Sequence, residues 1–196
     1  MKEYYDTRAP EYDDWYRGHG LFAERDRPGW EAELEQLVAV VRALPAARTL
    51  DVACGTGFLT RHLHGDVVGL DQSARMLDVA PRQAPNATFV EGDALDLPFP
   101  DGTFDRVFSG HFYGHLEPAE RKRFLREARR VARELVLVDA SRAHSGIDEH
   151  MSPRVLNDGS RWEVFKRYFT GPQLVAELGG GDVLLEERYF VVVRSG

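Results

Sequence analysis

The feature that most constrains the fold is a glycine turn that directly follows an apolar run. The stretch LDVACGTGFLT covers residues 50–60 and places Gly55 and Gly57 two positions apart. An apolar strand, a glycine turn and a helix-like pattern form a site for an anion or a polar group, because glycines let a ligand approach the backbone and free N–H groups point at it. The turn therefore predicts a nucleotide-type ligand at the end of a first strand.

Two phosphate-binding patterns fit this turn poorly. A P-loop needs Lys and then Ser or Thr after its last glycine, whereas Gly57 is followed by Phe58 and Leu59. The dinucleotide pattern G-x-G-x-x-G needs a third glycine at position 60, which is Thr60. The sequence therefore excludes the P-loop and leaves the dinucleotide pattern incomplete.

Acidic residues follow the next two predicted strands. Asp71 ends the second strand, 20 residues after Asp51. A carboxylate there can accept hydrogen bonds from both ribose hydroxyls, which requires no pyrophosphate. The alternative is that Asp71 only caps the next helix. Asp93, after the third strand, could read an adenine edge.

Strand and helix patterns alternate along most of the chain, which predicts an α/β fold with a mostly parallel sheet. Predicted strands are RTLDVA, DVVGLD, ATFVEGD, FDRVFSG and ELVLVDA, and predicted helices cover 30–44, 73–79 and 118–133. Residues 182–195 read as two strands with almost no connection, so they must form an antiparallel hairpin. We expect the parallel sheet to end in one antiparallel strand.

Two segments fall outside this alternation. Residues 141–169 are polar and then aromatic, contain the turn sequence LNDGS, and follow the carboxyl end of a strand, where a lid or substrate wall belongs. Residues 1–29 are acidic and rich in tyrosine, and we expect them to form a cap. The whole chain, residues 1–196, is predicted to form one domain that includes both segments.

Composition limits the environment and the partners. The net charge of −7 argues against a nucleic-acid partner, and no apolar run approaches the ~20 residues that span a membrane. Cys54 is the only cysteine, so an intramolecular disulfide is impossible and a reducing compartment is expected. The acidic, aromatic start of the chain matches neither a signal nor a transit peptide. These features predict a cytoplasmic protein.

Four motifs in order carry a family resemblance: LDVACGTGFLT, VVGLDQSARML, FVEGDALDLPFPDGTFDRVFS and GHL. They resemble the class I S-adenosylmethionine (SAM)-dependent methyltransferases, in the small-molecule group related to the ubiquinone and menaquinone enzymes. The resemblance covers residues 4 to about 137. It implies a Rossmann-like three-layer sandwich with strand order 3-2-1-4-5-7-6, SAM as cofactor, S-adenosylhomocysteine (SAH) as product, and a small-molecule acceptor.

The resemblance also implies roles for individual residues. The acid that positions the loop and the methionine amine is Asp51, and the loop backbone along methionine and ribose is Ala53, Cys54, Gly55 and Gly57. The ribose acid is Asp71, the adenine contacts are Gln72, Met76, Asp93 and Ala94, the fourth-strand tip beneath the sulfonium is Ser109, and the cap tyrosines are Tyr5 and Tyr12.

The sulfonium makes its methyl group electrophilic without help, so the protein must align donor and acceptor and exclude water. An oxygen or carbon acceptor also needs a proton removed, and His111 and His115 after the fourth strand are the candidate bases. The alternative is that both histidines pack locally. Nucleophilic catalysis by Cys54 lacks any sign of a lowered pKa, and no histidine spacing predicts a metal site.

The remaining expectations concern partners and rival functions. The helix over 118–133 carries seven basic residues between Glu120 and Arg133, which form either a solvated face or a nucleic-acid surface; the acidic chain favours the solvated face. We expect no nucleic acid, no membrane, and a monomer or homodimer. Rival functions are a non-catalytic SAM-binding module and an NAD(P)-dependent oxidoreductase, the latter disfavoured by Thr60. The acceptor atom (O, N or C) stays open.

Overall fold

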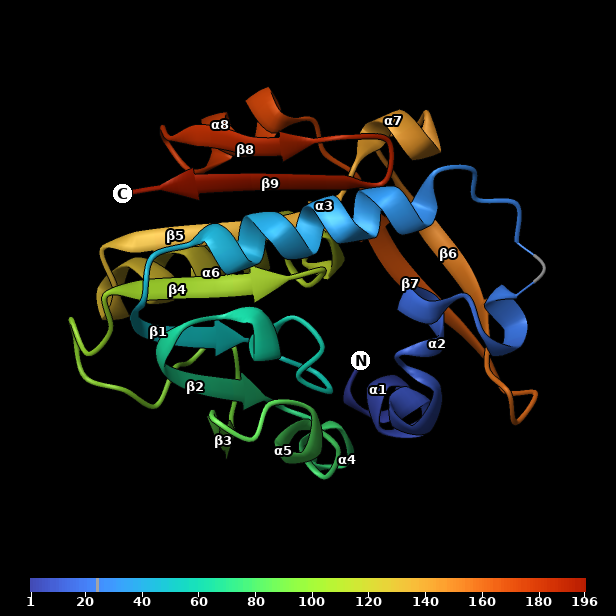
Figure 1. Ribbon diagram of the computed structural model, residues 1–196, viewed down its shortest axis with the longest axis horizontal. Coiled ribbons are helices and arrows are strands. Elements are labelled where there is room, and N and C mark those ends of the chain that lie inside the picture. Colours follow the sequence, from blue (N-terminus) through green and yellow to red (C-terminus); the bar gives the residue numbers. More distant parts are fainter. Residues whose placement is uncertain (24) are drawn as a thin grey trace.

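A seven-stranded sheet forms the centre of the computed structural model, which describes residues 1–23 and 25–196 (Figure 1). Its strands are β1 (Ala47–Val52), β2 (Gly65–Asp71), β3 (Thr88–Glu91), β4 (Arg106–Gly110), β5 (Glu134–Ala140), β8 (Asp182–Glu186) and β9 (Phe190–Ser195). They lie in the order β3-β2-β1-β4-β5-β9-β8, and β9 runs antiparallel to both of its neighbours. The predicted order is confirmed, since β8 and β9 are the sixth and seventh strands of this sheet.

Helices cover both faces of the sheet, which explains why its central strands are mostly apolar. α3 (Trp30–Ala43) lies in front of the sheet in Figure 1, and α6 (Pro118–Val131) lies behind it. The spacing of the apolar residues places Leu37 and Val41 of α3 in one core cluster, and Phe124 and Ala128 of α6 in the other. α8 (Gly171–Glu177) joins the α6 layer through Leu174. The three predicted layers are confirmed.

Residues after β5 form a separate hairpin. α7 (Arg142–Ser145) leads into β6 (Glu149–Val155) and β7 (Arg161–Arg167), which pair antiparallel around the predicted LNDGS turn. The segment leaves and rejoins the sheet at one point: Arg142 N–H donates to the Phe169 carbonyl at 2.8 Å, and Phe169 N–H donates to the Ala140 carbonyl at 3.1 Å. We refer to residues 141–169 as the insertion.

The N-terminal segment consists of α1 (Lys2–Arg8), η1 (Ala9–Glu11), α2 (Asp14–Arg17) and η2 (Gly20–Phe22). Figure 1 shows α1 and α2 between the carboxyl ends of β1 and β2 and the β6–β7 hairpin. Tyr4 packs with Leu156 and Val164 of the insertion in a small apolar cluster. We refer to the described part of residues 1–29 as the cap.

Two helices differ from the sequence predictions. The helix expected over 73–79 is split into α4 (Ala74–Leu77) and α5 (Ala80–Gln83), and Pro81 lies in the first turn of α5 instead of ending a helix. Proline suits a first helical turn because the N–H that it lacks has no partner there. The helix-like pattern after the glycines is only the short 3-10 turn η3 (Thr60–His62), because β2 begins three residues later at Gly65.

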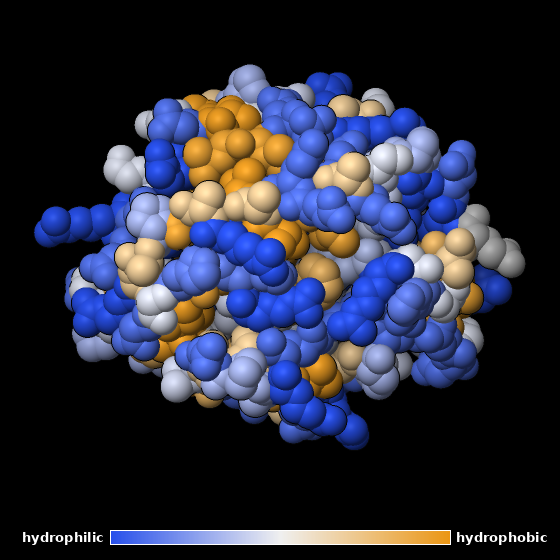
Figure 2. Space-filling model, viewed as in Figure 1, coloured by the Kyte–Doolittle hydropathy of each residue, from blue (hydrophilic) through white to orange (hydrophobic). Residues whose placement is uncertain are grey.

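Figure 2 shows apolar residues gathered on one face, over β8. Val183 is 41% exposed there, and Leu184 and Leu185 are half-buried. Along the part of the chain that the structure describes, no helix has the length and apolarity needed to cross a membrane. The homodimer and monomer alternatives both stay predictions.

Candidate cofactor and active site

A cavity of about 340 Å³ lies at the carboxyl ends of β1, β2, β3 and β4. Such an edge is where open α/β sheets bind their ligands. The predicted site residues that line it are Tyr5, Tyr12, Ala53, Gly55, Asp71, Gln72, Met76, Asp93, Ala94 and His111. The structure therefore brings together side chains from the cap and from the ends of four strands.

The glycine turn adopts the left-handed backbone that its sequence suggests. Gly55 and Gly57 have φ angles of 56° and 80°, and Ala53 shares this conformation with φ 59°. A Cβ atom on Gly55 would lie 3.5 Å from the Tyr12 ring. That distance is an ordinary van der Waals contact, so it is the left-handed backbone and not the space that favours glycine at this position.

The Asp71 carboxylate is fixed by two backbone donors. Its Oδ2 accepts the Gly55 N–H and its Oδ1 accepts the Ser73 N–H, both at 2.9 Å. Each carboxylate oxygen can accept a further hydrogen bond, and the residue lines the cavity. The cap of α4 is the Ser73 hydroxyl, which accepts the Met76 N–H. A purely capping role therefore explains less of the position of Asp71 than a ligand-binding role does.

Asp51 lies beneath the glycine turn and is completely enclosed. It accepts a 2.6 Å hydrogen bond from the Thr60 hydroxyl, the residue that stands where a dinucleotide site has its third glycine. Burial raises the pKa of the Asp51 carboxyl to about 7. With Ala53 and Cys54 it lines a water-sized cavity next to the larger one. A cationic ligand group placed there favours the ionised carboxylate.

Three predicted residues of the loop and of the strand beside it do not line the larger cavity: Cys54, Gly57 and Ser109. The buried Ser109 hydroxyl donates to the Val52 carbonyl at 2.8 Å, which ties the tip of β4 to β1. Gly57 packs against the backbone of Ala80. Burial raises the pKa of the Cys54 thiol well above its usual range, which disfavours a nucleophilic role.

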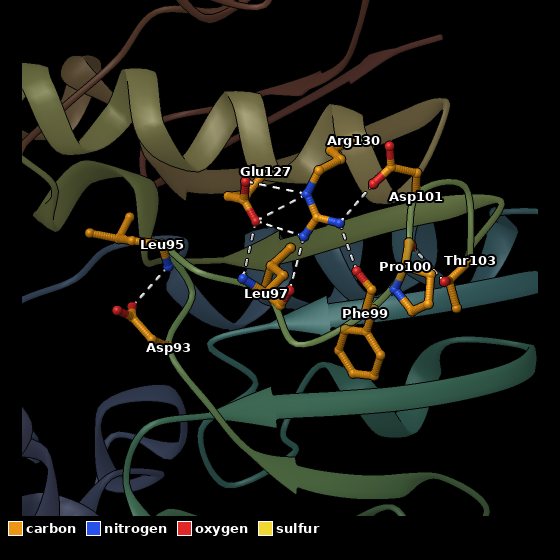
Figure 3. A network of polar contacts seen from close by, with 9 residues as sticks. All are labelled: Asp93, Leu95, Leu97, Phe99, Pro100, Asp101, Thr103, Glu127 and Arg130. Carbon is orange, nitrogen blue, oxygen red and sulfur yellow. Dashed lines mark hydrogen bonds and ion pairs between the residues drawn. The ribbon is translucent and has the colours of Figure 1, made fainter.

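The loop that carries Asp93 and Ala94 is held by a residue of α6 (Figure 3). Arg130 donates to the carbonyls of Leu97 and Phe99 at 2.9 and 2.7 Å. It also pairs with Glu127 and Asp101. The sequence pattern shows Arg130 only as part of a basic helix face, although its side chain shapes this wall of the site.

The cap is attached to the loops after β1 and β2. Asp13 accepts a 2.6 Å hydrogen bond from the Thr56 hydroxyl and another from Gln83, and Asp6 accepts one of 2.6 Å from the Ser73 hydroxyl. The Tyr16 ring stacks on Phe58 with centroids 3.8 Å apart. The sequence suggested a cap but did not identify these two acids as its attachment points.

His111 occupies the cavity wall in an aromatic surround. Its backbone is left-handed, with φ 57°. The centroid of its ring lies 4.9 Å from the ring centroid of Trp15 and 5.7 Å from that of Phe190. Burial lowers the pKa of His111 to about 4, so the ring is neutral at pH 7. Its buried Nε2 has no hydrogen-bond partner among residues 1–23 and 25–196.

His115 lies differently. Its Nδ1 is 2.8 Å from the Phe165 carbonyl of β7, so that nitrogen must carry the proton. Its ring approaches Tyr5 at 6.4 Å but does not line the cavity. Burial lowers the pKa of His115 to about 3. The structure therefore brings His111 to the cavity and places His115 against the insertion.

Comparison with known proteins identifies the family. The "Methyltransferase domain" family matches residues 49–134. The chain is 35% identical over 102 residues to a demethylmenaquinone methyltransferase of Thermotoga maritima, covering 50% of this chain and 44% of the relative. It is 33% identical over 143 residues to a 2-phytyl-1,4-naphtoquinone methyltransferase of Trichormus variabilis, covering 67% and 59%. The chain thus spans about half the length of these relatives.

A solved complex of DhpI with SAM and HEP shares the whole fold. It has a TM-score of 0.74, is 27% identical, and covers 98% of this chain and 94% of that one. The chain belongs to the class I SAM-dependent methyltransferases. The predicted family is thereby confirmed, and an NAD(P)-dependent oxidoreductase is disfavoured.

One buried ion pair of the chain was missed from the sequence. Lys166 of β7 donates to Asp139 of β5 at 2.6 Å, and both side chains are almost fully buried. Asp139 also accepts the Gly114 N–H at 2.7 Å. Burial raises the pKa of Asp139, but Lys166, His111 and a backbone hydrogen bond together outweigh burial and hold that pKa below its usual value. The only sequence signal is an aspartate at the end of the apolar strand ELVLVDA.

Proposed function

We propose that this methyltransferase binds SAM in the 340 Å³ cavity and transfers its methyl group to a small-molecule acceptor. The observation that carries the proposal is the Asp71 carboxylate, which is anchored to the Gly55 N–H and lines the cavity. The names of the matched relatives, which are quinone methyltransferases, and the SAM complex of DhpI support it.

The residues present fit SAM at three points. Asp51, whose pKa of about 7 allows ionisation beside a cation, suits the methionine amine. Asp71 suits the ribose hydroxyls, since each of its oxygens can accept another hydrogen bond. Met76 and Asp93 suit the faces and the edge of adenine. The individual roles of all thirteen cofactor residues are part of the proposal.

Bound SAM supplies an electrophilic methyl group, so the chain's own task is to position the acceptor and exclude water. The cap covers the loops after β1 and β2, with Tyr5 and Tyr12 on the cavity wall. His111 is neutral at pH 7 and is the candidate base for an oxygen or carbon acceptor. His115 is assigned instead to positioning the segment that carries His111.

Some finer expectations stay predictions alongside this proposal: a cytoplasmic location, a monomer or homodimer, and no nucleic-acid partner. For the last, the contacts of α6 add support. Arg121, Arg129 and Arg130, three of the six basic residues of α6, contact Glu177, the Leu178 carbonyl and the Glu127 network. These contacts engage part of the positive charge that α6 would need in order to bind a phosphate backbone.

The test is titration calorimetry with SAM and SAH on the unaltered chain and on Asp71→Ala. We expect binding that Asp71→Ala weakens by tenfold or more, about 1.4 kcal/mol. Asp66→Ala, an exposed acid at the other end of β2, is the matched control and should stay within about twofold. Absence of SAM and SAH binding by the unaltered chain would overturn the cofactor assignment.

Binding alone does not separate an enzyme from a SAM-binding module. Transfer of a labelled methyl group is therefore measured across a panel of oxygen, nitrogen and carbon acceptors, with His111→Gln as the comparison. We expect transfer that His111→Gln slows by about 10²-fold or more for oxygen acceptors. Tight SAM binding with no transfer to any acceptor would favour the non-catalytic alternative.

A further inference from the structure

The inner face of the β6–β7 hairpin is polar and cationic. Along β6 and β7 the side chains alternate, and the cross-strand pairs on the more buried face are His150 with Lys166, Ser152 with Val164, and Arg154 with Trp162. The Trp162 ring contacts Tyr4 of the cap at 5.8 Å, which shows that this face is turned toward the cap. No carboxylate lies among these six residues.

Arg8 and Arg154 belong to the two segments that meet at the Tyr4–Trp162 contact. Arg8 of α1 donates to the Tyr4 hydroxyl at 3.0 Å. Arg154 is the cross-strand neighbour of Trp162, which packs on Tyr4. Within the described chain, neither arginine forms an ion pair, whereas Arg142 and Arg167 of the same insertion pair with Asp148 and Glu149.

The two acids near these arginines already accept hydrogen bonds. Asp139 accepts hydrogen bonds from both Lys166 and the Gly114 N–H. Glu11 of the cap accepts the Asn157 N–H at the hairpin turn. Glu11 keeps its negative charge, so the region between cap and hairpin holds the cations Arg8, Arg154 and Lys166 and the anions Asp139 and Glu11, of which Asp139 pairs with Lys166.

The neighbouring histidines lie within reach of these charges. Burial is the main cause of the lowered pKa of His115, and Lys166 and Arg154 lower it further. Burial is likewise the main cause of the lowered pKa of His111; Asp139, the next largest influence, raises that pKa, and Lys166 and Arg8 lower it. Lys166 therefore acts on both rings, Arg154 on His115 and Arg8 on His111.

From this placement we infer that the acceptor carries an anionic group, a carboxylate or a phosphate, which binds Arg8 and Arg154 between the cap and the hairpin. The inference rests on the proposed methyl transfer and specifies its substrate class. A half-buried guanidinium without a counter-ion is unfavourable, and its planar fork matches carboxylate and phosphate oxygens. With the anion held there, the rest of the acceptor can extend toward His111.

Aromatic contacts do not remove the need for an anion. The Arg8 guanidinium lies 4.7 Å from the Tyr12 ring centroid, a contact that leaves the positive charge in place. Within the described chain, no aromatic ring lies beneath the Arg154 guanidinium. Arg154 is on β6, which pairs with the strand β7 that carries the buried Lys166. An acceptor that supplied only a flat apolar ring would leave both guanidinium groups without a counter-charge.

The test is calorimetry on the SAH-saturated chain with benzoate, its neutral isostere benzamide, and inorganic phosphate. We expect benzoate and phosphate to bind at millimolar concentrations and benzamide to bind at least tenfold more weakly. Arg154→Gln should weaken benzoate by tenfold or more, about 1.4 kcal/mol, while SAH affinity stays within about twofold. Arg154→Lys, which keeps the charge, should retain most of the binding.

Arg161→Gln is the matched control, because Arg161 lies on the exposed face of the same hairpin and loses the same charge. Equal binding of benzoate and benzamide, no anion binding up to about 10 mM, or equal losses in Arg154→Gln and Arg161→Gln would overturn the inference. Failure of the unaltered chain to bind SAH at all would instead contradict the proposed function, which keeps the two outcomes apart.

Discussion

The two sides of the cavity are built from segments of different kinds. On the cofactor side, loops after β1, β2 and β3 present Gly55, Asp71 and Asp93, each within a few residues of its strand. On the side proposed to receive the acceptor, the cap lines the cavity and meets the insertion, which packs behind it, across more than 100 residues of chain, as in the hydrogen bond from Asn157 to Glu11. The first side depends on local backbone geometry and the second on long-range packing.

This difference has an energetic consequence. The cofactor side is supported by the sheet and by α6, so a single change there should alter affinity more than stability. The acceptor side depends on a few side-chain contacts, chiefly the pair Asp139–Lys166 and the Tyr4 cluster. A change there should loosen the cap and the insertion together.

The largest expected effect is from Lys166→Met, which tests whether the acceptor side depends on its ion pair. Removing Lys166 leaves the Asp139 charge buried with only backbone donors, so we expect the free energy of unfolding to fall by about 3–5 kcal/mol. Urea denaturation measures the loss. The double variant Lys166→Met/Asp139→Leu should recover part of it. A change below about 1 kcal/mol in Lys166→Met would contradict the assigned role.

Acid sensitivity should come next in size. His111 has a pKa of about 4 in the folded chain and about 6.5 when unfolded. Between these values the unfolded state binds more protons, so stability falls as the pH drops from about 6.5 to 4, by up to about 1.4 kcal/mol per pH unit.

The comparison variant is His111→Gln, which should unfold less steeply over the same range in a pH series of urea melts. His115 acts in the same direction, with its pKa of about 3. Asp51 acts in the opposite direction, because its raised pKa of about 7 makes the folded state bind more protons as the pH falls. An identical acid slope in the unaltered chain and His111→Gln would exclude a neutral, buried His111.

Gly57→Ala tests the backbone geometry of the cofactor side. Its φ of 80° strains any L-residue by about 1–2 kcal/mol, and the new Cβ would meet the Ala80 carbonyl at 3.3 Å. We expect lower stability and SAH affinity reduced several-fold. Gly102→Ala is the control: its φ is 63°, but no atom lies within 4 Å of the new Cβ, so only stability should fall. Similar SAH losses in both variants would refute a local effect.

The smallest expected effect is from Arg130→Met, which releases the loop carrying Asp93. Loss of the contacts to Leu97 and Phe99 should reduce stability by about 1 kcal/mol and SAH affinity a few-fold. Arg126→Met, an exposed residue of the same helix, should change neither. Thermal unfolding with and without SAH measures both quantities.

The fold and the cofactor side were predictable because their signals are local. Each of these signals can be recognised within a short stretch of sequence: the apolar runs, the glycines at 55 and 57, and the acid at Asp71. Pro81 misled the prediction because a proline fits a helix start as well as a helix end. Lys166 was not predictable, because no spacing along the chain indicates that the end of β7 meets the end of β5.

The way in which the insertion joins the sheet has a consequence for variation among sequences. Its two ends lie side by side, joined by the backbone hydrogen bonds of Phe169 to Ala140 and Arg142. A loop whose ends are pinned together can lengthen or shorten with little entropic cost. The residues between these two ends can therefore be replaced as one unit while the sheet stays unchanged. Such a replacement would change the acceptor and leave the cofactor-binding residues in place.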